Sequence, residues 1–297
     1  MRRILSGLAL SILGCAEPHR TLPACADPAD AATSADPTLL AVGDLALCHD
    51  PSAATLAAFF DRNEGTIGVL GDIVYESGSL DELLDCYEPA MGRHRGRTRP
   101  SVGNHEYRTP HAGAYFSYFC GLGGEPFKGW YSYELGAWHV VVLNSNCNEV
   151  GCDGASEQVR WLRADLAAHP SRCTVAYWHH PRFNSGAHGA EPRVQPFWDA
   201  LDAAGAELVL NGHEHAYERF VPQTSAGVRD DARGLRQLIV GTGGRSPSAL
   251  RDLQQNSAVR LEASIAILEL KLHDGSYDFR LVGADGKALD SGRGDCH

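Results

Sequence analysis

The sequence predicts an α/β fold built in layers, with β-sheets inside and helices on the outer faces. Short apolar runs alternate with segments of helical periodicity from residue 38 onward, and the last part of the chain is rich in strand patterns. The 297 residues are 43% hydrophobic and 21% charged, which is enough apolar material for one large core. Because no second domain boundary follows residue 38, we expect one domain over residues 38–297.

Strands and helices alternate in the first part of this domain. Apolar runs predict strands over residues 38–47, 66–75 and 99–107. Helical spacing of apolar residues predicts helices over residues 51–62 and 79–91. We expect Ser52 to be the N-cap of the first of these helices.

The second part continues the alternation and then becomes mainly β. The segment 129–145 predicts two strands joined by a tight turn at Leu135-Gly136. Further strands are predicted over 173–181 and 206–215, and helices over 156–169 and 193–205. The segment from residue 235 to residue 286 predicts strands, with a hairpin turn at Asp274-Gly275.

The N-terminus has the features of an export signal. Arg2 and Arg3 precede an apolar stretch over residues 4–14, which is too short to span a bilayer. Cys15 follows a segment similar to the one before the lipid-modified cysteine of bacterial lipoproteins, and plain secretion with later cleavage is the alternative. Residues 15–37 are rich in Ala, Pro and Asp and predict a flexible tether. We therefore expect a lipid-anchored cell-envelope protein, or a periplasmic or secreted one.

Cysteine content and charge agree with an exported protein that does not bind nucleic acid. If Cys15 carries a lipid, eight of the nine cysteines remain, and an even number in an exported chain predicts disulfides. Cys147 and Cys152 flank a short loop that a disulfide could close, whereas the other pairings cannot be read from the sequence. The net charge of -11 argues against a nucleic-acid partner. It does not argue against a small anionic substrate, because a bound cation can reverse the local field.

Polar residues follow five of the predicted strands, at the point where each strand ends. In open α/β sheets, ligands bind beyond the carboxyl ends of the strands, so we expect these residues to converge. His213 and His215 share one face of an extended segment and can point to the same ion. The five clusters are Asp44, Asp72, Asn104-His105-Glu106, His179-His180 and His213-Glu214-His215.

These residue types predict a metal site. Carboxylates, an amide oxygen and imidazoles are ligands suited to zinc, iron or manganese. A shared carboxylate can bridge two cations ~3.5–4 Å apart, which is the arrangement used to hydrolyse phosphate esters. Asp72 is the candidate bridge.

The five segments together resemble the motif series of the calcineurin-like metallophosphoesterases, and most of all the purple acid phosphatase branch. The motifs follow the family's order over about residues 38–245: Gly43-Asp44, GDIVY at 71–75, GNHE at 103–106, VAYWHHP at 175–181 and GHEHAYER at 212–219. The resemblance implies a layered α/β/β/α metallophosphoesterase sandwich, with mixed β-sheets flanked by helices. It also implies a binuclear, metal-dependent phosphatase that cleaves phosphate monoesters by attack of a metal-bound hydroxide, without an organic cofactor.

One departure from the general motif points to this branch. Most family members carry Asp-x-His at the first motif, but position 46 is alanine here. Purple acid phosphatases use the tyrosine of GDxxY instead, and Tyr75 occupies that position. The resemblance therefore implies Fe(III) at the Tyr75 site and zinc, iron or manganese at the second site. It places Asp44, Asp72, Tyr75 and His215 around the first metal, and Asp72, Asn104, His179 and His213 around the second.

Two further histidines are candidate catalytic residues. The resemblance implies that His105 orients the phosphate or protonates the leaving alcohol, and that His188 lines the substrate pocket. The glycine-rich segment 241–246 lacks the lysine of a phosphate-binding loop, so we interpret it as a turn that packs near the site. Two alternatives stay open: a phosphodiesterase or nucleotide hydrolase that uses the same site, and a non-catalytic metal-binding surface lipoprotein.

Overall fold

The structure is a computed structural model that describes residues 21–25, 36–45, 48 and 50–297. The predicted signal segment, Cys15 and most of the predicted tether lie outside these residues. Among the residues described, no helix has the length and apolar character needed to cross a membrane.

The first of two β-sheets has six strands in the order β13-β12-β11-β1-β2-β3. Its three strands β1, β2 and β3 are parallel, and β11, β12 and β13 extend it in antiparallel fashion. The strands are β1 Thr38–Val42, β2 Thr66–Leu70, β3 Thr98–Ser101, β11 Ala266–His273, β12 Ser276–Gly283 and β13 Ala288–Asp295.

The second sheet has seven strands in the order β10-β8-β9-β7-β6-β5-β4. Its central strands β5, β6, β7 and β9 are parallel, whereas β4, β8 and β10 are antiparallel to their neighbours. The strands are β4 Tyr131–Leu135, β5 Trp138–Val142, β6 Cys173–Trp178, β7 Leu208–Asn211, β8 Tyr217–Phe220, β9 Arg236–Val240 and β10 Ser257–Leu261.

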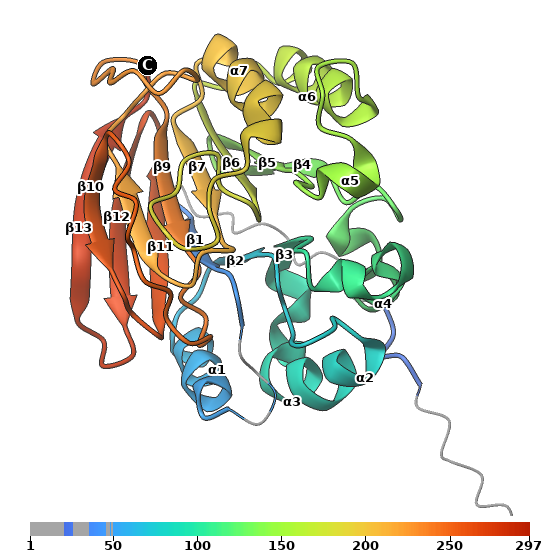
Figure 1. Cartoon of the computed structure of the whole chain (residues 1–297). Coiled ribbons are helices and arrows are strands. Elements are labelled where there is room, and N and C mark those ends of the chain that lie inside the picture. The colour runs from blue at the N-terminus through green and yellow to red at the C-terminus, as the bar shows by residue number, and fades with distance from the viewer. Residues whose placement is uncertain (1–20, 26–35, 46–47, 49) are drawn as a thin grey trace, which may run out of the picture.

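Helices cover the outer face of each sheet, which gives the four layers seen in Figure 1. One apolar core lies under the helices of the first sheet, one lies between the sheets, and one lies under α6 and α7. This α/β/β/α arrangement with two mixed sheets confirms the predicted fold class. The helices are α1 Ser52–Arg62, α2 Leu80–Glu82, α3 Glu88–Met91, α4 Gly113–Phe119, α5 Cys147–Val150, α6 Glu157–Ala168 and α7 Gln195–Ala204.

Local structure departs from the sequence predictions at two points. Ser52 is the first residue of α1 and Pro51 occupies the N-cap position, so the assignment of Ser52 as N-cap is wrong. The backbone N–H of Ser52 instead donates to the Asp50 carboxylate at 2.8 Å, which satisfies one free donor of the first turn. The β4–β5 turn lies on Gly136 and Ala137, one residue later than predicted, because Leu135 is still paired with Trp138.

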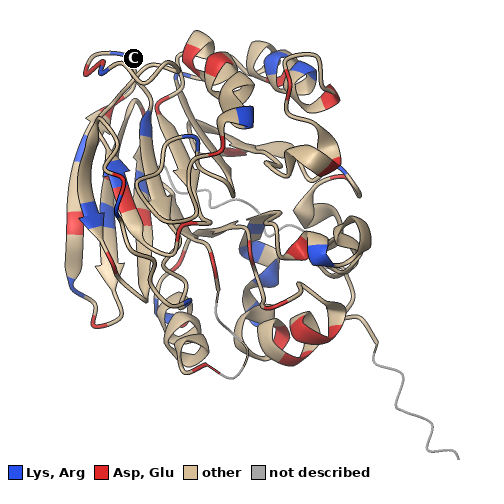
Figure 2. Cartoon of the chain, in the orientation of Figure 1, with Lys and Arg blue, Asp and Glu red and all other residues tan. Residues whose placement is uncertain are grey.

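Four disulfides use the eight cysteines that remain after Cys15, and they include the predicted Cys147–Cys152 pair. Cys173–Cys296 ties the C-terminus to the start of β6, and Cys25–Cys120 ties the predicted tether to the end of α4. The fourth pair is Cys48–Cys86. Lysine, arginine and acidic residues are interspersed over the helices and outer strands seen in Figure 2.

Candidate metal centre

The carboxyl ends of parallel strands from both sheets bring the predicted polar residues together. Asp44 and Asp72 follow β1 and β2 in the first sheet, and His179 follows β6 in the second. Backbone hydrogen bonds join the two edges, since the N–H of Gly43 donates to the carbonyl of Val240 at 2.8 Å. The site is therefore formed where the ends of the two sheets meet.

The residues predicted for the first metal form one group. The Tyr75 hydroxyl donates to Asp44 Oδ1 at 2.9 Å and lies 3.1 Å from Asp72 Oδ2. His215 Nε2 lies 3.6 Å from Asp44 Oδ1. The four side chains therefore face a common point, and both carboxylates are fully or almost fully buried.

The residues predicted for the second metal form a group around His179. Its Nε2 atom lies 3.3 Å from Asp72 Oδ2, 3.0 Å from Asn104 Oδ1 and 3.2 Å from His213 Nδ1. Asp72 thus contacts both groups through the same oxygen, Oδ2. This is the position that a bridging carboxylate would occupy.

The donor set fits a cation better than it fits a hydrogen-bond network. Nδ1 of His179 lies 2.8 Å from the carbonyl oxygen of Leu70, which can only accept, so Nδ1 carries the hydrogen. In the neutral imidazole, Nε2 then has a free lone pair that faces the oxygens of Asp72 and Asn104. Lone pairs that converge in this way are stabilised by a positive ion.

The pKa values of the group are shifted by burial and by the close approach of two carboxylates and an imidazole. Burial raises the pKa of Asp44 to about 7, and the neighbouring Asp72 carboxylate adds to this effect against the attraction of His179. Burial alone would lower the pKa of His179, but the carboxylates of Asp72 and Asp44 outweigh it and raise the pKa to about 9. Burial and the same two carboxylates raise the pKa of the Tyr75 phenol well above its usual value.

The backbone at the strand ends adopts conformations that most residues avoid. Asp44, Asp72 and His213 have φ values of 63°, 50° and 70° in the left-handed region. A Cβ atom at Gly103 would lie 2.1 Å from Asp72 Oδ1, so only glycine allows the β2 and β3 ends to approach so closely. Such conformations typically gather at functional sites, where the surrounding structure maintains them.

Glu106 has a structural function that the sequence analysis did not identify. Its buried carboxylate accepts hydrogen bonds from the backbone N–H groups of Asp72, Ile73 and Gly103, at 3.0, 2.8 and 2.7 Å. It thereby fixes the ends of β2 and β3 relative to each other. The sequence did indicate that this residue belongs to the site, since Glu106 is the last residue of the GNHE segment.

The two candidate catalytic histidines lie beside the group. The ring of His105 is 4.3 Å from the ring of Tyr75, and the backbone N–H of His105 donates to Asp72 Oδ1 at 2.9 Å. The ring of His188 is 4.9 Å from that of His215 and 5.2 Å from that of His213. Both histidines are thus adjacent to the residues predicted as metal ligands.

His188 is held in place by Glu214, a strand-end residue to which the sequence analysis assigned no function. The Glu214 carboxylate accepts from the backbone N–H of His188 at 3.0 Å, and its Oε1 lies 3.3 Å from His188 Nδ1. It also accepts from Asn184 Nδ2 at 2.9 Å. A Cβ atom at Gly186 would lie 1.9 Å from this carboxylate group, so the loop closes around it.

His180 is not in either predicted ligand set, but it lies beside the second group. Its ring is 4.4 Å from the ring of His213, and its Nδ1 lies 2.8 Å from Ser145 Oγ. Nitrogen atoms of His179, His180 and His213 lie within 4.8 Å of one another. Burial and the nearby charge of His179 together lower the pKa of His180 to about 3, which leaves the imidazole neutral.

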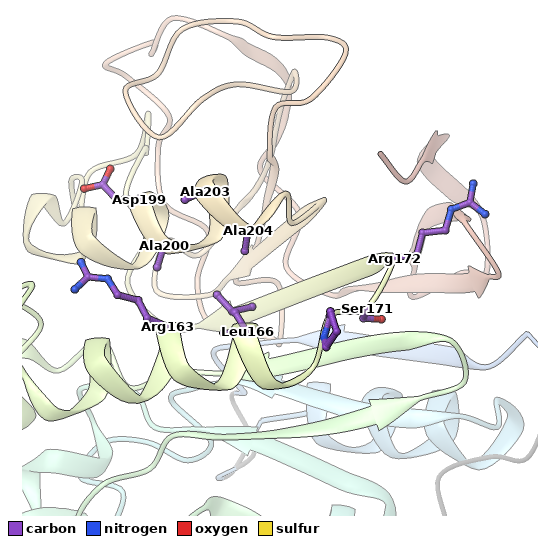
Figure 3. A pocket seen from close by; sticks show the side chains of 10 residues that line it. Arg163, Leu166, Ser171, Arg172, Asp199, Ala200, Ala203 and Ala204 are labelled. Carbon is purple, nitrogen blue, oxygen red and sulfur yellow. The ribbon is translucent and has the colours of Figure 1, made fainter.

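Two hollows border the strand-end group. One of about 450 Å³ is lined by Tyr75, Glu76 and Arg245, and one of about 230 Å³ is lined by Asn104 and His180. A larger groove of about 810 Å³ lies between α6 and α7. Figure 3 shows that alanine and leucine side chains line this groove together with Arg163, Arg172 and Asp199, and none of the strand-end residues lines it.

The fold and these donor residues define the class of layered α/β/β/α metallophosphoesterases. The model of the calcineurin-like phosphoesterase family matches residues 37–217, and the chain belongs to that family. Its curated relatives include purple acid phosphatase 15 of Arabidopsis thaliana, which is 26% identical over 254 residues, or 73% of this chain and 47% of the relative. Acid phosphatase type 7 of Homo sapiens is 28% identical over 197 residues, or 55% of this chain and 43% of the relative.

These comparisons confirm the predicted resemblance to purple acid phosphatases, although the chain spans only about half the length of these relatives. Among solved structures, purple acid phosphatase PPD1 from yellow lupin matches with a TM-score of 0.73 at 17% identity, over 87% of this chain and 53% of that one. GAP50, described as the anchor in the inner membrane complex of Plasmodium, matches with a TM-score of 0.70 at 12% identity, over 89% and 90%. At these identities the structural likeness shows the fold alone.

Proposed function

We propose that this protein is an exported, binuclear metal-dependent phosphatase that hydrolyses phosphate monoesters. The observation that carries the proposal is the position of Asp72, whose Oδ2 lies 3.1 Å from the Tyr75 hydroxyl and 3.3 Å from His179 Nε2. A carboxylate shared by two donor groups is the arrangement that two-metal phosphoesterases need. The relatives named as acid phosphatases support the same reaction class.

Each metal has a proposed ligand set. The phenol of Tyr75 favours Fe(III) at the first site, because a hard cation stabilises the phenolate, and zinc, iron or manganese would suit the second site. When bound, the two ions supply Lewis-acid stabilisation of phosphoryl charge and acidify water. The first set is Asp44, Asp72, Tyr75 and His215, and the second is Asp72, Asn104, His179 and His213, with His180 adjacent to it.

His105 is the proposed proton donor to the leaving alcohol. Its Nδ1 atom lies 2.6 Å from the carbonyl oxygen of Glu76, which orients the ring by accepting the Nδ1 hydrogen. Nε2 is then the atom on the site side, 3.8 Å from Asp72 Oδ2. Arg108 Nη2, which can only donate, lies 3.1 Å from Nε2, so Nε2 must exchange this hydrogen bond for a proton before it can protonate an ester oxygen bound beside Asp72.

His188 is proposed to hold the phosphate group from the opposite side. The Glu214 carboxylate beside Nδ1 fixes the ring orientation and stabilises its protonated form, which can donate to a phosphoryl oxygen. Its side chain is 39% exposed, so a substrate can reach it.

Export is proposed from the sequence together with the disulfides. Four disulfides within the described residues are typical of proteins from oxidising compartments. We propose that residues 1–14 are the signal, residues 15–37 the tether and residues 38–297 the phosphoesterase domain. A lipid on Cys15 would place the protein on the cell envelope, and cleavage without a lipid would release it.

The test is hydrolysis of p-nitrophenyl phosphate by the full-length protein loaded with iron and zinc. Asn104→Ala removes a proposed ligand, and we expect kcat to fall at least about 100-fold. The matched control is Asn63→Ala, because Asn63 ends α1 at the opposite end of the first sheet. Its kcat should stay within about twofold of the wild-type value. An unchanged rate in Asn104→Ala would contradict the proposal.

Two alternatives are distinguished by the same assay. A phosphodiesterase would cleave bis(p-nitrophenyl) phosphate faster than the monoester. A non-catalytic surface protein would cleave neither.

A further inference from the structure

A second cluster of metal-type side chains lies at the other end of the seven-stranded sheet. His139 is on β5, Asp165 is on α6, and His169 follows the last turn of α6. One ligand atom from each residue lies within 4.8 Å of the others. His139 pairs with Thr174 near the start of β6, whereas His179 follows the end of that strand, roughly 16 Å further along. The cluster is therefore separate from the strand-end group.

Asp165 is fixed between the two imidazoles. Its Oδ2 lies 2.8 Å from His139 Nε2, and its Oδ1 lies 3.4 Å from His169 Nδ1. Ser132 donates to Oδ1 at 2.8 Å and sets the orientation of the carboxylate. Residues 165 and 169 are four apart at the end of a helix, so their side chains lie on one face.

We propose that this cluster is a zinc site, with His139 Nε2, the Asp165 carboxylate and His169 Nδ1 as ligands. Two imidazoles and a carboxylate are ligands that zinc accepts, and the half-exposed position of His169 leaves a fourth position open to water. Glu134 Oε1 lies 2.7 Å from His139 Nδ1 and accepts its hydrogen. A carboxylate behind a ligating histidine fixes the ring and directs the lone pair of the other nitrogen to the ion.

A buried ion pair beside a capped helix end is the competing interpretation of the cluster. His139 between Glu134 and Asp165 would be stable as an imidazolium without any metal. In that interpretation His169 caps the end of α6, since its Nδ1 lies 3.0 Å from the backbone carbonyl of Asp165, which can only accept. The His169 ring is also stacked on that of His139, with 4.8 Å between centroids and 14° between planes, so it must turn and give up the bond to Asp165 to direct Nδ1 at an ion. The side chain is 48% exposed, which leaves room for this rotation.

An ion at this site would have a structural effect. Glu134 belongs to β4, the edge strand of the sheet, and Asp165 belongs to α6 above it. Zinc would therefore join the β4–β5 hairpin to the helix layer. Because the ion binds the folded state, it should raise the unfolding temperature, and the rise should grow with the free zinc concentration relative to Kd.

The experiment uses full-length protein with the strand-end sites already filled and loosely bound metal removed. Zinc is then titrated by calorimetry, and the unfolding temperature is measured with and without zinc. We expect the wild type to bind one further equivalent and to unfold at a higher temperature when it is bound. His169→Ala should weaken this binding at least about tenfold and abolish the temperature shift, with phosphatase activity unchanged.

The matched control is His273→Ala, which removes another histidine that lies beside two aspartates, Asp36 and Asp278, on the other sheet. This variant should bind zinc like the wild type. His169→Gln serves as a second variant in case alanine disturbs the end of α6. The proposal is overturned if the wild type takes up no further equivalent of zinc, or if both His169 variants bind zinc as tightly as the wild type does. It is also overturned if His273→Ala loses zinc binding to the same extent as the His169 variants.

Discussion

The hydroxyl oxygen of Tyr75 lies 2.9 Å from Asp44 Oδ1, although 31 residues separate the two along the chain. The same hydroxyl lies 3.1 Å from Asp72 Oδ2. Burial and these two carboxylates raise the pKa of the phenol, so the phenolate needs a strongly charged cation beside it. The contact between Tyr75 and Asp44 is therefore the structural basis for the proposal of a ferric ion at the first site.

Tyr75→Phe should remove the colour of the iron-loaded protein. We expect wild-type protein to show a visible phenolate-to-iron charge-transfer band, and we expect the variant to lack it because no phenolate remains. Iron retention should fall as well, since one of four proposed ligands is lost. Tyr107→Phe is the control, because its hydroxyl accepts from Asn144 instead of contacting the strand-end carboxylates. A band that persists unchanged in Tyr75→Phe would contradict the assignment.

Glu214 and His188 should act as a unit. If Glu214 orients His188, then Glu214→Gln and His188→Ala should each lower kcat/KM, and the double variant should lose little more than His188→Ala alone. Kinetics of the two single variants and the double variant measure this coupling. Losses that simply add would mean that the two residues contribute independently.

Two of the disulfides, Cys173–Cys296 and Cys147–Cys152, should contribute unequally to stability. Cys173–Cys296 closes a loop with a sequence separation of 123, and Cys147–Cys152 one of 5. Loop entropy alone predicts losses of about 5 and about 2 kcal/mol in the free energy of unfolding when each pair is replaced by serines. Urea unfolding of the two double variants tests which disulfide contributes more to the free energy of unfolding. Equal losses would show that loop length does not set the contribution.

Glu207 should make the folded state less stable as pH rises. Burial raises its pKa from 4.5 to about 7, although the backbone N–H groups of Thr174 and His297 oppose this by donating to it. Between these values the folded state binds more protons than the unfolded state, so stability falls with increasing pH. Glu207→Gln should match the wild type below pH 4.5 and exceed its stability by up to about 3 kcal/mol above pH 7. Urea unfolding at pH 4.5 and pH 8 measures the difference in the free energy of unfolding between the variant and the wild type. A difference that is the same at both pH values would contradict the prediction.

The fold was predictable because strand patterns and turn residues are local. The apolar runs that end at Gly43-Asp44 and Gly71-Asp72 correspond to β1 and β2, and Asp274-Gly275 forms the β11–β12 turn. The N-cap of α1 was missed because Ser52 fits the capping preference, whereas the observed helix starts after Pro51. The pairing Cys173–Cys296 could not be predicted, since it depends on how β13 returns to β6.

The strand-end residues were predictable as a set, but their supporting contacts were not. Asp44, Asp72 and His179 follow strands, and strand ends meet at one edge of a sheet by general rule. Glu106 and Glu214 act through hydrogen bonds to backbone and side-chain groups of neighbouring loops, and these contacts exist only in the folded chain. The cluster of His139, Asp165 and His169 was missed for the same reason, because a strand and a helix bring it together.

The metal content of the wild type and of Asp72→Asn tests the central claim most directly. Iron and zinc are measured per chain after loading and after removal of loosely bound ions, with Glu76→Gln as the control, since the Glu76 carboxylate bonds Arg245 outside the ligand sets. If Asp72 is shared by both ions, the wild type and the control retain two ions at the strand-end site and Asp72→Asn retains neither. Retention of both ions by Asp72→Asn would contradict the account.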